Sequence, residues 1–170
     1  MAKWPMGETE IEQLLDANEL EALTGAAAEG HRLLDQARST AATAETLTAR
    51  DSYSAYVLAY DAARFACIAL LAQQGLRATS KGGHYAVERA VRAQFGTGFR
   101  PFADLRRRRN ELEYPRLPAD TATTEEASEA VEDAKRLIIA ADALLDQLSF
   151  FGQPGPPARG PERESHKQRP

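Results

Sequence analysis

Four consecutive arginines, Arg106 to Arg109, stand in a chain whose formal net charge is −4. Asn-Glu-Leu-Glu-Tyr and then Pro115 follow them. In the whole stretch from Arg100 to Arg116 there are six arginines and three acids. A guanidinium group can grip a phosphate through two parallel N–H donors. A charge run is more commonly a solvated surface. The direction in which each arginine points decides between these interpretations.

A helix from about Pro101 to Tyr114 gives the four arginines different surroundings, because successive residues turn by about 100°. Arg109 falls within a narrow apolar stripe whose other members are Phe102, Leu105 and Leu112. Glu113 is its neighbour one helical turn later, and Arg108 lies on the opposite face, which we expect to be exposed. Arg109 therefore stands where a leucine is expected.

Two interpretations of Arg109 remain open. It forms a structural ion pair with Glu113 or with an acid on a neighbouring helix, or it is held at a seam between helices or subunits to bind phosphate. For Arg106 and Arg107 we expect flanking solvent positions, with attraction of phosphate as a secondary role.

A second arginine interrupts an apolar stripe in the segment that begins at Ser52. Arg64 lies among apolar residues at helical spacing, namely Tyr53, Val57, Tyr60, Ile68 and Leu71. Asp61, three residues earlier, is close enough on a helix to pair with it. We interpret Asp61 and Arg64 as a structural ion pair.

The elements that must position these residues are predicted to be helices. Alanine is abundant and β-branched residues are few, and no alternating strand pattern is found. Asp51 and Ser52 offer an N-cap, and Thr123 with Glu126 matches a capping box. The predicted helices cover an opening segment with Ile11, Leu14 and Leu15, then about 26–47, 52–74, 84–95, 101–114 and a last segment within 123–151 whose apolar stripe runs from Ala127 to Leu145. The sequence thus predicts an all-α bundle of about five to six helices.

The 170 residues suit a single domain, which we place at 1–151. Residues 152–170 are rich in proline and glycine and nearly lack apolar side chains, so we expect a disordered tail. The lone Cys67 has apolar neighbours and is expected to be a reduced core thiol. We expect a cytoplasmic protein, because no signal peptide or uninterrupted membrane span is recognised.

The motif Arg109-Asn110-x-x-Glu113-Tyr114, with the preceding "AYVLAYDAARFACIALLAQQGLRATSKGGHYAVERAVRAQFG", resembles the HEPN superfamily over roughly residues 51–150. The resemblance implies an α-helical bundle that forms homodimers through facing motif helices. Many such proteins are metal-independent ribonucleases, including toxins paired with a minimal nucleotidyltransferase antitoxin. Arg109 matches the family's arginine and Asn110 its polar residue. The resemblance therefore makes Arg109, Asn110 and Tyr114 the candidate catalytic residues, with no cofactor.

Tyr114 stands at the position of the family's histidine. An unperturbed tyrosine has a pKa of about 10 and is a poor base near neutral pH. His84, after the Gly82-Gly83 turn, is interpreted as a turn residue, with anion binding as the alternative. No group of His, Cys or acidic residues has convincing metal-ligand spacing, so no metal is expected.

Two functions follow from these residues. The first is an RNA- or nucleotide-associated HEPN module with weak or lost ribonuclease activity, which acts through dimerisation and partner binding. The second is an active metal-independent endoribonuclease toxin. The missing motif histidine favours the first, and the Arg109–Asn110 pair with its local positive charge keeps the second open.

Overall fold

The computed structural model describes residues 4–23, 30–117 and 120–151, and the predicted all-α bundle is confirmed. The predicted tail at 152–170 and the start of the second helix at 26–29 lie outside these residues. In chain order the elements are α1 (Glu8–Asp16), β1 (Leu20–Ala22), α2 (Gly30–Leu47), α3 (Ser52–Gln73), β2 (Leu76–Ala78), α4 (Gly83–Phe95), the 3₁₀ helix η1 (Gly96–Phe99), α5 (Arg100–Glu113) and α6 (Thr124–Leu145).

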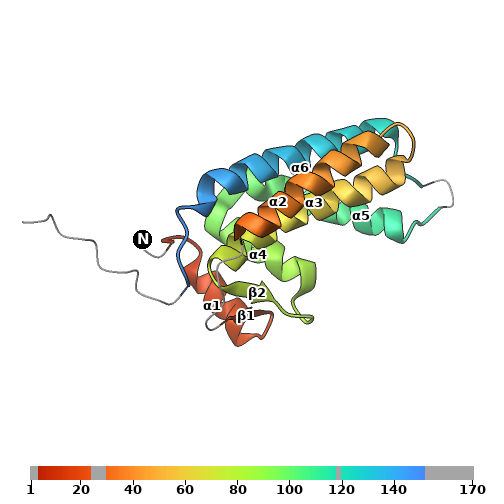
Figure 1. Cartoon of the computed structure of the whole chain (residues 1–170). Helices are drawn as coiled ribbons and strands as arrows, with labels where there is room; N and C mark the ends of the chain where they lie inside the picture. The colour runs from red at the N-terminus through yellow and green to blue at the C-terminus, as the bar shows by residue number, and fades with distance from the viewer. Residues whose placement is uncertain (1–3, 24–29, 118–119, 152–170) are drawn as a thin grey trace, which may run out of the picture.

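Helix α3 is the centre of the bundle. It packs along α2 and α6 on one side, while α4 and α5 lie against it on the other (Figure 1). Small side chains permit this close packing, because an alanine lets two helix backbones approach. The buried alanines of α3 are Ala55, Ala59, Ala62, Ala63, Ala66 and Ala69.

The predicted single apolar stripe of α3 is therefore an incomplete description of its packing. Tyr60 and Leu71 are 1% exposed, but Tyr53 is 41% exposed and Val57 and Ile68 are half-buried. Alanine faces make the rest of the helix equally buried, and small residues do not stand out in a hydrophobic pattern.

By length and composition α3 would also be able to cross a membrane, although the sequence argument found no such segment. In the structure 61% of its most apolar window is buried against the rest of the bundle. The core helix of a helical bundle meets the same criteria of length and composition.

Both predicted helix starts are capped as the sequence suggests. The Asp51 carboxylate accepts from the backbone N–H of Ser54 at 2.9 Å. Thr123 and Glu126 form the reciprocal capping box, with bonds of 3.1 and 2.9 Å. These caps satisfy N–H groups that a helix start leaves without a partner.

A two-stranded antiparallel sheet was not predicted. Strands β1 and β2 pair Leu20 with Ala78 and Ala22 with Leu76. Each strand has three residues, too short for an alternating pattern to be recognised. This small sheet fixes the chain just before α4 (Figure 1), and so helps to position the start of that helix.

Candidate functional site

Two glycines place His84 at the first turn of α4. A Cβ atom on Gly82 would come within 2.2 Å of the backbone oxygen of Glu19, so this close approach requires glycine. Gly83 has a φ of 52°, a conformation that side chains other than glycine disfavour. The same Glu19 oxygen accepts from the backbone N–H of Thr79 at 3.0 Å. The turn therefore packs tightly against the backbone just before β1, and this packing fixes the position of His84.

The side chain of His84 contacts Tyr60 of α3. The Tyr60 hydroxyl lies 2.6 Å from Nδ1 of His84, and Tyr60 itself is 1% exposed. Its ring stacks on Phe102 of α5 at 5.9 Å between centroids, with the planes 2° apart. Burial raises the pKa of Tyr60 to about 12, so its hydroxyl remains protonated near neutral pH. Tyr60 thus holds the imidazole ring in one orientation.

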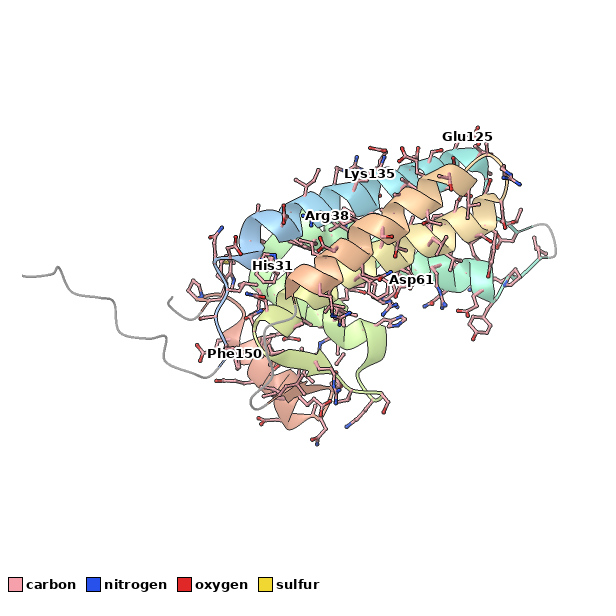
Figure 2. All side chains as sticks on the ribbon, viewed as in Figure 1. His31, Arg38, Asp61, Glu125, Lys135 and Phe150 are labelled. Carbon is pink, nitrogen blue, oxygen red and sulfur yellow. The ribbon has the colours of Figure 1, made fainter. Side chains whose placement is uncertain are left out.

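Two arginines surround this hydrogen-bonded pair. The guanidinium of Arg109 lies 5.8 Å from the centroid of the Tyr60 ring, a cation–π arrangement, and forms an ion pair with Glu113. Arg64 pairs with Asp61 at 3.1 Å and remains 21% exposed. Figure 2 labels Asp61 at the edge of α3 that borders α4 and α5. The two arginines of the interrupted stripes therefore converge on one place.

The surroundings of His84 favour its neutral form. Partial burial lowers the pKa of His84 below its ordinary value, and the positive charges of Arg64 and Arg109 lower it further. The ring is held by Nδ1, and the residue as a whole remains exposed. The opposite nitrogen, Nε2, is the one available to a ligand.

Tyr60 can either donate to Nδ1 or accept from it, and the direction sets the tautomer of His84. When the hydroxyl donates, Nε2 carries a hydrogen and can donate to a phosphate oxygen. When the hydroxyl accepts, Nε2 has a free lone pair and can take a proton. The same pair therefore supports anion binding and general base chemistry.

The other arginines of the run have separate partners. Arg106 binds Glu88 of α4 at 2.6 Å and lies 5.6 Å from the ring centroid of Tyr85. Arg107 forms an ion pair with Asp104 and is 66% exposed. The expected solvent position is therefore wrong for Arg106, which is 20% exposed because it pairs with the buried Glu88, while the exposed Arg107 agrees with it.

Asn110 and Tyr114 are not brought to the Tyr60–His84 pair. Asn110 is exposed, and its backbone oxygen accepts from the N–H of Tyr114 at 3.0 Å. Tyr114 is 76% exposed and caps α5 with a φ of −124°, outside helical geometry. The residue before a proline avoids the helical region, so Pro115 explains this conformation.

Arg108 corrects the expectation of an exposed, unengaged side chain. It is 25% exposed and pairs with Glu126 and Asp120, each at 3.1 Å, and with Glu111 at 3.3 Å. It ties α5 to the start of α6. The helical projection could not reveal this, because the acids at 120 and 126 belong to a segment whose position only the tertiary fold defines.

Within residues 4–23, 30–117 and 120–151, no three His, Cys, Asp or Glu side chains are grouped closely enough to hold a metal ion. Cys67 is buried, and burial raises the pKa of its thiol. A buried thiol with a raised pKa is a poor nucleophile.

The contact of His84 with Tyr60 was not predicted, because from the sequence His84 is interpreted as a turn residue with anion binding as the alternative. His84 lies 24 positions after Tyr60, and no helical periodicity relates residues on two different helices. The signal available in the sequence was the Gly-Gly pair, which marks a constrained turn directly before a titratable side chain. No protein-family model matches the chain, and neither a curated protein nor a solved structure matches it significantly.

Proposed function

We propose that this chain is a HEPN-like protein that binds RNA through the Arg64–Arg109 site, formed by Tyr60, Arg64, His84 and Arg109. One observation carries the proposal: two half-buried arginines flank an accessible imidazole whose ring is fixed by a buried tyrosine. The combination supplies hydrogen-bond donors beside an imidazole that is exposed to solvent.

The ion pairs of the site leave donors free for a ligand. A guanidinium has five N–H donors. Arg64 uses its Nε and one Nη for Asp61, and Arg109 uses one Nη for Glu113. The two acids nonetheless cancel the charge of the two arginines, so attraction of phosphate at neutral pH is modest. Protonation of His84 makes the site cationic, and RNA binding should therefore strengthen as the pH falls through the lowered pKa of His84.

Ribonuclease activity is the second candidate, and His84 is the observation that favours it. With a free Nε2 lone pair, His84 can take the proton of a ribose 2′-hydroxyl while that oxygen attacks the adjacent phosphorus. The 5′-oxygen then leaves and takes a proton from water, and a 2′,3′-cyclic phosphate forms. The site has one histidine and Tyr114 faces solvent, so acid assistance to the leaving oxygen is missing and cleavage should be weak.

Anisotropy of a fluorescent single-stranded RNA tests the binding proposal. Arg64→Gln and Arg109→Gln should each weaken binding roughly tenfold, the loss expected for one charged hydrogen bond. Arg136→Gln is the matched control, because Arg136 also pairs with an acid three residues away but lies on α6 at 67% exposure. Equal losses in all three variants, or none, would contradict the proposed site.

Cleavage is measured separately, with EDTA present to exclude metal ions. His84→Asn should abolish any cyclic phosphate product and change RNA binding at neutral pH by less than Arg109→Gln does. Tyr114→Phe should leave both unchanged. If the cyclic phosphate still forms in His84→Asn but not in Tyr114→Phe, Tyr114 and not His84 is the catalytic residue.

Homodimer formation through α3 and α5 is part of the proposal. Its support is the row of incompletely buried apolar side chains beside the site, Tyr53, Val57 and Ile68. Light scattering at micromolar concentration should give twice the chain mass, and a monomer would count against the interface. The resemblance further implies a minimal nucleotidyltransferase partner, which copurification would test.

A further inference from the structure

A cleft of about 540 Å³ opens between α4, η1 and α5, beside the Arg64–Arg109 site but distinct from it. Its charged lining consists of Arg92, Arg100, Arg106, Arg107, Glu88 and Asp104. Four positive charges thus face two negative ones. None of the residues that form the Tyr60–His84 pair lines it.

The four arginines differ in how they are satisfied. Arg106 is held by the buried Glu88, and Arg107 by Asp104. Arg92 and Arg100 are exposed, and no other residue that the structure describes holds either guanidinium by a hydrogen bond or an ion pair. Two guanidinium groups that line one cleft and pair with no other described residue are an arrangement suited to a phosphate group.

The remaining lining has no charge. Gly96, Thr97, Phe99 and Ala103 form this part, and a Cβ atom on Gly96 would meet nothing within 4 Å. The volume lies within the roughly 300–1,000 Å³ typical of small-molecule sites and far exceeds what one phosphate ion fills. A ligand that suits the whole cleft therefore joins a phosphate to an uncharged body of nucleoside size.

From these features we infer that the α4–α5 cleft binds a nucleoside phosphate, with Arg92 and Arg100 holding the phosphate and the Gly96–Ala103 side receiving the nucleoside. Arg106 connects this cleft with the Arg64–Arg109 site, since it lines the cleft and its charge also acts on His84. The ligand is therefore a free mononucleotide or one nucleotide of an RNA strand. The shared chemistry is a phosphate attached to a nucleoside.

Calorimetry on the full chain tests this inference with three probes: AMP, adenosine, and a six-nucleotide RNA with a 5′-phosphate. The wild type should bind AMP with one site per chain and bind adenosine at least tenfold more weakly. Arg92→Gln combined with Arg100→Gln should weaken AMP binding roughly tenfold or more, because two charged contacts are removed. Arg50→Gln combined with Arg136→Gln removes the same charge outside the cleft and should leave AMP binding unchanged.

The RNA probe separates the two sources of ligand. If the wild type does not bind AMP and the Arg92/Arg100 variant loses RNA binding, the ligand of the cleft is one nucleotide of an RNA strand. If the wild type binds AMP, the ligand is a free nucleotide. Adenosine binding equal to AMP binding, or no effect of the double variant on either phosphorylated probe, would overturn the inference. Arg64→Gln should leave AMP binding intact, so failure of the RNA proposal is distinguishable from failure here. Arg92 and Arg100 are exposed and pair with no residue in the described part of the chain, so the variant should melt as the wild type does.

Discussion

Along the seam between α2 and α6, charged side chains pair across the two helices at the surface: His31 with Asp146, Arg38 with Asp142 and Lys135 with Glu45. Figure 2 labels His31, Arg38 and Lys135 along this seam. Around α4 and α5 several positive groups are instead half-buried or unpaired. Arg106 and Arg109 lie over aromatic rings, and among the described residues no acid pairs with Arg92 or Arg100.

The difference between the two regions indicates which charged side chains serve the stability of the fold and which serve binding. Exposed ion pairs such as those of the seam contribute about 0–1 kcal/mol each and are screened by salt. Half-buried cations are costly unless a partner compensates them. The half-buried Arg106 and Arg109 have acid partners, whereas Arg92 and Arg100 are exposed and pair with no acid among the residues that the structure describes. Arginines that stay without an acid on this face are better explained by a bound anion than by stability alone.

The largest effect should come from the turn that positions His84. Gly82→Ala places a methyl group against the Glu19 carbonyl oxygen, which must move, and we expect a loss of about 2–4 kcal/mol in the free energy of unfolding. Chemical denaturation measures it. Gly98→Ala is the matched control, because a Cβ atom there meets nothing within 4 Å. Similar stabilities for the two variants would show that the turn yields easily.

Removing one carboxylate from the α4–α5 region, and one from the seam between α2 and α6, tests the comparison directly. Glu88→Gln leaves Arg106, whose side chain is 20% exposed, without its charged partner and should cost about 1–2 kcal/mol. Denaturation curves with and without added salt give the value. If removal of Glu88 were no more costly than removal of a seam acid, the distinction between the two regions would fail.

The pKa of His84 reports the positive charge of the α4–α5 region. Because partial burial and then Arg64 and Arg109 lower its pKa, the folded protein binds the proton less tightly than the unfolded chain does. The stabilising contribution is therefore complete above pH 6.5 and is lost as the pH falls through the folded pKa. Arg109→Gln should raise the pKa of His84, as followed by NMR of the imidazole signals. An unchanged pKa in that variant would place the charge of Arg109 too far away to matter.

The smallest effect belongs to the seam. Asp142→Asn removes one partner of Arg38, which keeps Asp35, and both members of the lost pair are about half exposed. We expect a change below about 0.5 kcal/mol that disappears in high salt. A loss above about 1 kcal/mol, measured by the same denaturation, would mean that the seam is a stabilising network.

Sequence patterns predicted the helices because their information is local. Alanine content, the Asp51 and Thr123 caps and the apolar spacing of α5 act within one or two turns, and the structure contains each of them. Three-residue strands carry too little pattern, so β1 and β2 escaped prediction. The candidate site was predictable in part: Arg64 and Arg109 stood out because each interrupts an apolar stripe of its own helix.

The sequence by itself determined that two arginines sit on apolar helix faces with an acid one turn away, because that depends only on helical geometry. Tertiary structure decided what those faces meet. Packing of α3 against α4 and α5 brings Tyr60 to His84 and sets Arg109 over the tyrosine ring, while Tyr114 is left in solvent. Contacts between helices depend on which surfaces the whole core buries together, and no short stretch of the chain encodes that choice.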